Sequence, residues 1–331
     1  MFPYILKSVP ILTDEIIVAE NLTKIYKIHE KPEGFKNTVK DLFARKYVNK
    51  TAVDGVSFRV RRGEIAGLLG ENGAGKTTTL KMLAGILFPS WGSVSVAGFT
   101  PTQRKKAFLK KISFVMGNKS DINWDLPAAD TFRYQQLVYE IPDAEYKANL
   151  DMLSGLLGVG SLLNTQIRRL SLGERMKMEL INSFLYSPEI VFLDEPTIGL
   201  DLASQIAIRS FIKSYKRERD TTLIITSHYM DDIEETCDRV ILLSRGKKAF
   251  DGGIQELKRP DTPFRDIILS MMADSVSGNV GGPNVGAADT GNPANGVTDA
   301  VAPAGGAADA GAPANGTADA GDSAFDMDPQ Q

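Results

Sequence analysis

The fold is decided by nine residues, Gly70-Glu71-Asn72-Gly73-Ala74-Gly75-Lys76-Thr77-Thr78. They match G-x-x-x-x-G-K-[ST], the pattern of a loop that wraps the phosphates of a nucleotide. Glycines let successive backbone N–H groups curl around a phosphate, and a helix that starts after the loop adds its positive dipole end. The Lys76 ammonium is expected at the β- and γ-phosphates, and the Thr77 hydroxyl is expected to bind Mg²⁺. The stretch therefore predicts a nucleotide site.

The residues on either side supply the context that this pattern requires. Residues 64–69 are short and apolar enough to be a buried strand, and residues 79–87 repeat apolar side chains at helical spacing. Chance alone would produce this pattern in about one chain of this length in a hundred. Strand, glycine-rich loop and helix in this order make chance a poor explanation.

Composition divides the 331-residue chain in two. The first part has mixed charge and enough aliphatic residues for a sizeable core, whereas residues 275–331 are mostly Gly, Ala, Asp, Pro and Asn. Such a tail buries too little apolar area to offset chain entropy, so we expect it to be disordered. A net charge of -3 argues against a nucleic-acid partner. No run of 18 apolar residues is present, which predicts a cytoplasmic protein that does not span a membrane.

The order of apolar runs predicts an alternating α/β fold. Strands are expected at residues 16–20, 56–60, 64–69, 94–96, 112–116, 190–193, 222–226 and 240–243, the last of these being the final strand. The second and third are expected to form a hairpin through Arg62-Gly63. Residues 118–170 offer no strand and two helical stretches, at about 129–140 and 143–157. They are predicted to form an inserted helical subdomain.

Residues 28–51 interrupt this pattern. Their polar, lysine-rich sequence places Phe35, Val39, Leu42 and Phe43 at helical spacing, which predicts an amphipathic helix with a narrow apolar stripe. Two interpretations stay open for it: a helix on the surface of the domain, or a lever at a membrane interface.

Acidic residues and a histidine follow two of the predicted strands. Asp194 and Glu195 come directly after the apolar run 190–193, and Pro196 follows them. In enzymes with a phosphate-binding loop, one carboxylate on a neighbouring strand holds Mg²⁺ and a second polarises the attacking water. His228 follows the strand at 222–226, where it is expected to contact the γ-phosphate or that water; a lone histidine here more often caps a helix.

Taken together, these stretches resemble the ATP-binding subunit of ABC (ATP-binding cassette) transporters. The resemblance covers residues 15–258 and rests on loop 70–78, the signature-like Leu170-Ser171-Leu172-Gly173-Glu174, residues 190–196, the D-loop-like Gly199-Leu200-Asp201, and Thr226-Ser227-His228 with its switch-like histidine. The insertion at 28–51, residues 124–127 and residues 195–201 are most similar to ABC-2 type exporter ATPases of the multidrug or uncharacterised group.

This resemblance implies a domain plan. The fold would be a P-loop NTPase (RecA-like) core with an antiparallel β subdomain and an inserted α-helical subdomain. Its expected segments are an N-terminal extension (1–15), a nucleotide-binding domain (16–258) containing the insertion at 28–51 and the helical subdomain at 118–170, a C-terminal helix (259–274) and the tail (275–331).

It also implies a role for individual residues, with ATP and Mg²⁺ as cofactors. The catalytic residues would be Glu195 as the general base, His228 as the γ-phosphate sensor, and Lys76. Mg²⁺ would be held by Thr77, Asn118 and Asp194. The residues implied at ATP are Tyr26 (stacked on adenine), Gly70, Asn72, Gly73, Ala74, Gly75, Lys76, Thr77, Thr78 and Asn118, with Ser171, Gly173 and Asp201.

The implied assembly is a head-to-tail dimer, in which Ser171 and Gly173 close on the nucleotide of a second copy or of a paralogous cassette. ATP hydrolysis would drive export through separate transmembrane permease subunits of the ABC-2 type, with this chain on the inner face of the cell membrane and no nucleic acid bound. Asn118 stands where the family usually has Gln, and Leu172 and Glu174 replace Gly and Gln of its signature. Two alternative functions stay open: a soluble ABC protein acting on nucleic acid, and a regulatory module that hydrolyses ATP weakly.

Overall fold

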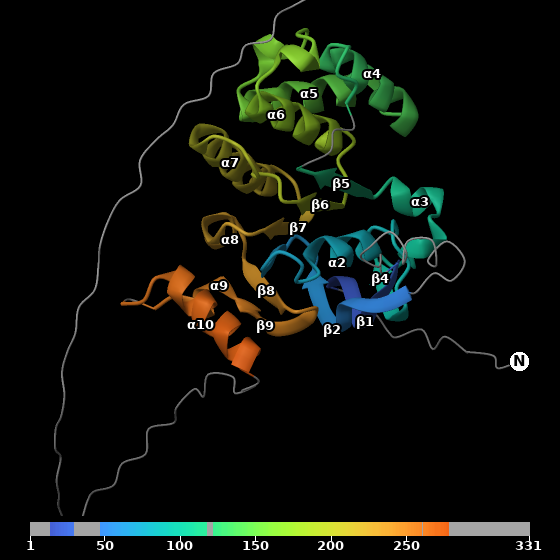
Figure 1. Cartoon of the computed structure of the whole chain (residues 1–331). Coiled ribbons are helices and arrows are strands. Elements are labelled where there is room, and N and C mark those ends of the chain that lie inside the picture. The colour runs from blue at the N-terminus through green and yellow to red at the C-terminus, as the bar shows by residue number, and fades with distance from the viewer. Residues whose placement is uncertain (1–13, 30–46, 118–121, 260, 278–331) are drawn as a thin grey trace, which may run out of the picture. The chain divides into compact units, whose positions relative to one another are not determined.

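A computed structural model describes residues 14–29, 47–117, 122–259 and 261–277. Its centre is a six-stranded sheet in the order β5-β6-β7-β3-β8-β9 (Figure 1). Five of its strands are parallel: β5 (Ile112–Met116), β6 (Ile190–Asp194), β7 (Thr222–Ser227), β3 (Ile65–Gly70) and β8 (Arg239–Ser244). β9 (Lys247–Gly253) closes one edge antiparallel to β8. The predicted α/β class is confirmed.

Each face of this sheet packs in its own hydrophobic cluster, because side chains alternate along a strand. In β6, Ile190 and Phe192 belong to one cluster, which also holds residues of α2 (Lys76–Leu83) and of a second, antiparallel sheet. Val191 and Leu193 belong to the other, together with the helices from α4 (Ala128–Tyr139) onward. Both faces are therefore covered, as the near-continuous apolar runs of parallel strands require.

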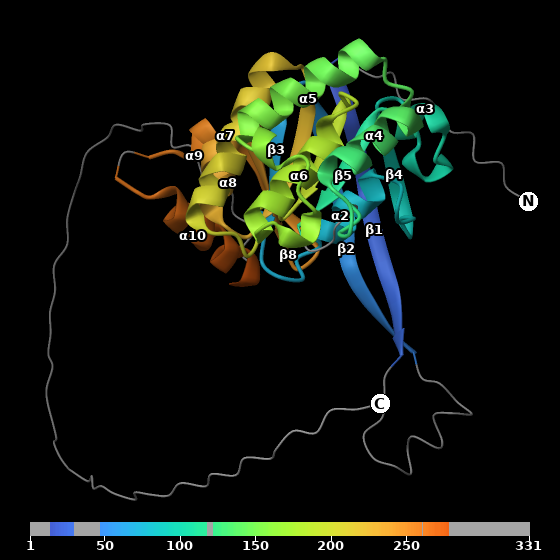
Figure 2. The same ribbon diagram turned by 90° about the horizontal axis from the view of Figure 1, so that it is seen from above.

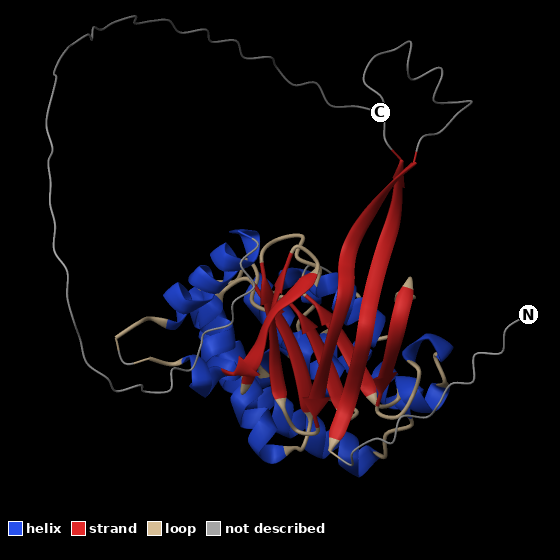
Figure 3. Cartoon of the chain, turned by 90° about the horizontal axis from the view of Figure 1, so that it is seen from below, coloured by secondary structure: helices blue, strands red, loops and turns tan. Residues whose placement is uncertain are grey.

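A second, antiparallel sheet has the order β2-β1-β4. It consists of β1 (Glu15–His29), β2 (Tyr47–Arg61) and β4 (Trp91–Val96). β1 and β2 pair from Glu15↔Arg61 to His29↔Tyr47, well past the end of β4 (Figures 2 and 3). The antiparallel β subdomain expected from the resemblance is present.

The remaining regular elements of the described chain are helices, and α4 and α5 coincide with the two helices expected in 118–170. Their bounds are α2 (Lys76–Leu83), α3 (Lys106–Leu109), α4 (Ala128–Tyr139), α5 (Asp143–Leu157), α6 (Leu172–Phe184), α7 (Leu202–Glu218), α8 (Met230–Thr236), α9 (Ile254–Leu257) and α10 (Phe264–Ser277), with short 3₁₀ turns at Pro101–Gln103, Gly160–Leu162 and Ile167–Arg169. Among these described helices, none combines the length and hydropathy needed to cross a bilayer.

The hairpin expected between residues 56–60 and 64–69 is wrong. β2 pairs with β1, whereas β3 lies between β7 and β8 in the other sheet. All six residues of β3 are buried, so the strand needs a partner on each side and a layer on each face. The turn at Gly63, with φ of +68°, carries the chain from one sheet to the other, and a Cβ there would lie 2.3 Å from Asp220 Oδ1.

Residues 240–243 are not in the last strand, because β9 follows β8. The sequence of β9 contains two lysines and two glycines, which have low strand propensity. It forms because Arg245 and Gly246 both have positive φ, at 49° and 81°, which makes a two-residue hairpin turn back onto the edge of β8. Pairing with the β8 backbone therefore stabilises β9 as a strand, although its side chains have low strand propensity.

The C-terminal helix begins later and ends later than the expected 259–274. α10 runs from Phe264 to Ser277, so it takes in the first residues assigned to the tail. Residues 264–277 contain no Gly or Pro, and Gly278 is the first helix breaker. The other domain boundaries stay predictions.

Several expectations fall on residues that are not described. The amphipathic helix at 28–51 is wrong at its two ends, where β1 continues to His29 and β2 starts at Tyr47. Its central part, like residues 1–13, Asn118 and residues 278–331, lies outside the described ranges.

Replacing Phe192 by Ala should cost about 3–5 kcal/mol of unfolding free energy, because it empties the centre of a fully buried strand. Its ring also packs on Phe114, with centroids 6.2 Å apart. Urea denaturation measures the loss. Leu137→Ala, at an exposed position on α4, is the control and should change stability by less than about 0.5 kcal/mol. Equal losses in both variants would contradict the core assignment.

Candidate nucleotide site

The functional side chains converge because parallel strands end at one edge of a sheet. β6, β7 and β3 are neighbours, and their carboxyl ends carry Asp194, Ser227 and the loop that starts at Gly70. In open α/β sheets, ligands bind outside these carboxyl ends. Segments more than a hundred residues apart in sequence thus meet at one place.

A cavity of about 360 Å³ lies against the phosphate loop, a volume suited to a small-molecule ligand. Its lining joins the loop to the antiparallel sheet: Tyr26, Ile28, Lys50, Ala52, Glu71, Asn72, Gly73, Gly75, Lys76, Thr77, Thr78 and Glu195. Most of the residues expected at ATP, Tyr26 included, are therefore in one place.

The walls of this cavity are joined by main-chain contacts. Gly75, at the start of α2, has φ of +104°, and a Cβ there would lie 2.6 Å from the Ala52 carbonyl oxygen. Only glycine fits this approach without strain. Gly246, in the β8–β9 turn, donates its N–H to the Ala74 carbonyl (3.2 Å) and accepts from the Asp54 N–H (2.8 Å). Loop, turn and β2 thus hold one another through backbone atoms.

Lys76 is buried at the head of α2, with 5% of its surface exposed. Its Nζ donates to the carbonyl oxygens of Gly70 (2.7 Å) and Glu71 (3.2 Å) and lies 3.7 Å from Glu195 Oε1. Burial lowers the pKa of Lys76, and the charges of Glu195 and Asp194 act in the opposite direction. A buried ammonium that faces a cavity favours an anionic ligand, so the site fits a phosphate.

Asp194 and two hydroxyls form the part of the site suited to a metal. Asp194 Oδ1 accepts from Thr77 Oγ1 (2.9 Å) and from Thr226 Oγ1 (2.7 Å). Carboxylate and hydroxyl oxygens are ligands that Mg²⁺ prefers, with water and phosphate completing its shell. The described residues contain no cluster of three or more His, Cys, Asp or Glu able to hold an ion alone. This donor set fits a metal bound together with a nucleotide.

Glu195 and His228 face each other across the ends of β6 and β7. His228 Nδ1 lies 3.3 Å from Glu195 Oε2, although it makes no regular hydrogen bond to any described residue. The backbone of Glu195 is in the left-handed region, with φ of +53°, which is uncommon for a non-glycine residue. Its N–H donates to Thr226 O (3.1 Å) and Thr226 Oγ1 (2.9 Å), and these bonds keep it there.

Ser171, Gly173 and Asp201 do not line this cavity. Ser171 caps α6 in a reciprocal box with Glu174, whose Oε2 accepts from the Ser171 N–H (2.8 Å). Asp201 caps α7 by accepting from the Ser204 N–H (2.9 Å) and hydroxyl (2.7 Å), and these bonds lower the pKa of Asp201. Gly173 packs against the same cap, because a Cβ there would lie 2.0 Å from Ser204 Oγ. The three residues form a second group, in which Ser171 and Asp201 are exposed and Gly173 is buried.

Sequence reasoning missed several contributors to the site, among them Lys50, Thr226 and Asp232. Lys50 lines the cavity because it pairs with Tyr26 in the register of β1 and β2. Thr226 and Asp232 hold the backbone near Glu195 and His228. Of these three, only Thr226 carried a sequence signal, as the last residue of the expected strand 222–226.

Fold and site together define a phosphate-loop ATPase, and the comparisons with known proteins name the class. Residues 53–198 match the ABC transporter family. ABC transporter ATP-binding protein NatA of Bacillus subtilis is 34% identical over 206 residues, which are 62% of this chain and 83% of NatA. Nod factor export ATP-binding protein I of Ralstonia nicotianae is 32% identical over 218 residues, 64% of this chain and 66% of that protein.

A solved structure shares the fold. It is the dimeric post-hydrolysis state of an ATP-binding cassette bound to ADP and Pi, with a TM-score of 0.60, 20% identity, and coverage of 72% of this chain and 98% of that one. The chain belongs to the ATP-binding subunits of the ABC transporter family, and it is an ATPase. The resemblance drawn from the sequence is confirmed.

Lys76→Ala should abolish the rise in melting temperature that ATP gives the wild-type protein, because the phosphates lose their buried cation. At a ligand concentration 100 times Kd that stabilisation is about 2.7 kcal/mol. Thermal denaturation with and without ATP measures it. Lys81→Ala, on the same helix and outside the cavity lining, is the control and should respond to ATP as the wild type does. An intact ATP response in Lys76→Ala would contradict the site.

Proposed function

We propose that this chain is the ATP-hydrolysing subunit of an ABC-2 type exporter and that it works as a head-to-tail dimer with separate permease subunits. The observation that carries the proposal is the division of its functional residues into two groups. Lys76, Thr77 and Glu195 line the cavity, whereas Ser171 and Gly173 lie outside it. Because Ser171 and Gly173 lie away from the cavity of their own chain, they are available to contact a nucleotide bound by a second chain.

The roles proposed at the first group follow from its contacts. The loop Gly70–Thr78 and Lys76 would hold the phosphates, and Tyr26, which lines the cavity, would stack on the base. Thr77 and Asp194, joined at 2.9 Å, would hold Mg²⁺, with Asn118 as a further proposed ligand. The metal would neutralise charge on the phosphates.

Hydrolysis needs a base for the attacking water. Glu195 is proposed for this role because its carboxylate faces both Lys76 and His228, at the point where the cavity meets the end of β6. His228 would contact the γ-phosphate. Because Glu195 and His228 contact each other, a hydrolysing enzyme is favoured over the weakly active regulatory module.

The second group lies beside exposed apolar side chains, which supports burial against another subunit. Leu172, half of whose surface is exposed, follows Ser171, and Leu202 and Ile206 are exposed on α7 next to Asp201. A Cβ on Gly199 would lie 3.6 Å from Leu172 Cδ2, so the signature-like and D-loop-like segments adjoin. Exposed apolar patches of this kind mark partner surfaces. The partner is a second copy or a paralogous cassette.

Glu195→Gln should reduce phosphate release by about 10²–10⁴-fold, because the amide cannot accept the proton of the water. The variant should also accumulate as a dimer with MgATP, which light scattering measures. Glu189→Gln, at the opposite end of β6, is the control and should hydrolyse ATP normally. Unchanged phosphate release from Glu195→Gln would refute the base. A monomer at saturating MgATP, also in the presence of the permease, would refute the dimer.

A surface on the helical subdomain suits the permease. Trp124 and Leu126, together with Tyr134, Leu137 and Val138 on α4, are exposed apolar side chains within residues 122–140. We propose that a cytosolic helix of the permease binds here and that the chain lies on the inner face of the membrane. Export as the direction is supported by the relative whose name states export of Nod factor.

A photo-cross-linker replacing Trp124 should attach to the permease in the assembled transporter, because it lies in this apolar surface. Mass spectrometry of the adducts identifies the partner. The chain offers a matched control in its other tryptophan, Trp91, which is exposed on β4 and should give no permease adduct. Adducts from Trp91 but not from Trp124 would place the docking surface elsewhere.

A further inference from the structure

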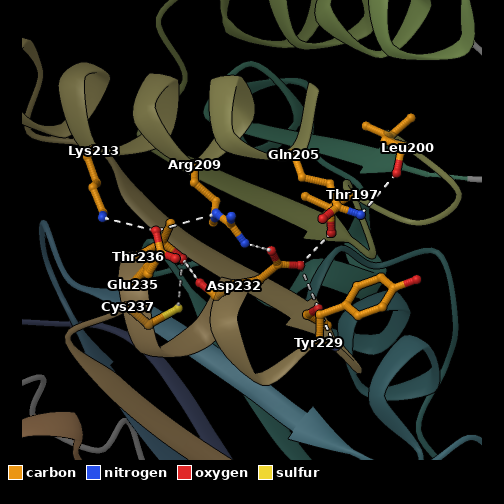
Figure 4. Close-up of polar contacts among 11 residues, drawn as sticks. Thr197, Leu200, Gln205, Arg209, Lys213, Tyr229, Asp232, Glu235, Thr236 and Cys237 are labelled. Carbon is orange, nitrogen blue, oxygen red and sulfur yellow. Dashed lines mark hydrogen bonds and ion pairs between the residues drawn. The ribbon is translucent and has the colours of Figure 1, made fainter. Parts of the chain in front are cut away.

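We propose that Asp232 is a positioning residue for hydrolysis: its carboxylate sets the distance between Glu195 and His228 by holding the two turns that carry them. This inference rests on the proposed roles of Glu195 and His228. It assigns a task to a residue outside the cavity lining, on the first turn of α8 (Figure 4).

Asp232 is a buried carboxylate with three donors. It is 3% exposed. Its Oδ2 accepts from the hydroxyls of Thr197 and Ser227, the latter at 2.9 Å, and its Oδ1 accepts from Arg209 Nη1 at 3.1 Å (Figure 4). Pairing and hydrogen bonds of this kind offset the cost of burying a carboxylate. Every contact of its side chain reaches a different segment of the chain.

Thr197 connects Asp232 to the turn of Glu195. The Ile198 N–H donates to the Glu195 carbonyl at 3.2 Å, so Thr197 is the third residue of a tight turn that begins at the proposed base. Thr226 holds the start of this turn through the Glu195 N–H. Asp232 holds its far side, and the positive φ of Glu195 is kept between these two anchors.

Ser227 connects the same oxygen of Asp232 to the bend of His228. Besides donating to Oδ2, Ser227 Oγ accepts from the Tyr229 N–H at 2.9 Å. This hydroxyl therefore connects the residues that precede and follow His228. One atom, Asp232 Oδ2, is therefore bonded to both turns. The functional groups that these turns present, Glu195 Oε2 and His228 Nδ1, are 3.3 Å apart.

Arg209 supplies the positive charge that pairs with Asp232. It lies buried on α7, and its Nε is 3.5 Å from Glu235 Oε2, which also lies 3.8 Å from Lys213 Nζ (Figure 4). Because α7 is capped by Asp201, this cation belongs to the helix that follows the D-loop-like segment. The network therefore links that helix to both catalytic turns.

A purely structural role predicts a different outcome from a positioning role. Loss of a buried hydroxyl contact lowers stability wherever it occurs. Only a contact that positions reacting groups also lowers kcat while leaving nucleotide affinity intact, since a displacement of about 1 Å costs on the order of 10²-fold in rate.

The test compares two substitutions of the same kind. Thr197→Val removes the hydroxyl that bonds to Asp232. Thr221→Val removes an equally buried hydroxyl, bonded at 3.2 Å to the Pro188 carbonyl at the opposite end of the sheet. We expect kcat of Thr197→Val to fall about 10–100-fold with KM for ATP within about twofold of wild type. Thr221→Val should keep wild-type kcat at a similar loss of melting temperature, and Thr197→Ser, which restores the hydroxyl, should regain it.

Equal kcat values for Thr197→Val and Thr221→Val would overturn the proposal, as would a parallel change of kcat and KM. If the Asp232→Asn variant folds, it provides a second test of the same contacts. If it does not fold, the kcat of Thr197→Val is sufficient to test the proposal. Failure here is distinct from failure of the proposed function, because Glu195→Gln reports on the base independently. If Glu195→Gln is inactive while Thr197→Val retains full kcat, the function stands and the positioning role falls.

Discussion

The parallel pairing of β3 with β7, and of β7 with β6, is the constraint on which the site depends. It brings the ends of three strands to one edge and sets the phosphate loop, the Asp194–Glu195 pair and Ser227-His228 side by side. Parallel strands need layers on both faces, and two separate hydrophobic clusters provide them. The contact of Thr77, at the start of α2, with Asp194 follows from this strand order, because α2 begins where the loop after β3 ends.

Short hydroxyl side chains then refine this arrangement. Thr226 joins Asp194 to the Glu195 backbone, and Thr197 and Ser227 join the following turns to Asp232. A hydroxyl both donates and accepts, so it can bond to a carboxylate and to a backbone N–H at once. The uncommon backbone conformation of Glu195 persists because these bonds determine it from both sides.

The sequence was sufficient for features that depend on local pattern. The phosphate loop, the buried β6 with its two acids, and the helices α4 and α5 each have a signal within a dozen residues. It was insufficient where the partner is distant. No local signal tells that β2 leaves β3 for β1, that Lys50 pairs with Tyr26, or that the lysine-rich β9 forms on the edge of β8. Asp232 was missed for the same reason, because its donors come from three other segments.

The main-chain bonds of Gly246 to Ala74 and Asp54 have a consequence for how this chain tolerates change over evolution. Exchange of the surrounding side chains leaves such bonds intact, so the spacing between β2 and the phosphate loop survives drift in composition. A deletion or insertion of a single residue in the β8–β9 turn, by contrast, would shift both bonds together. Length, more than chemical character, is the property that selection must preserve in this turn.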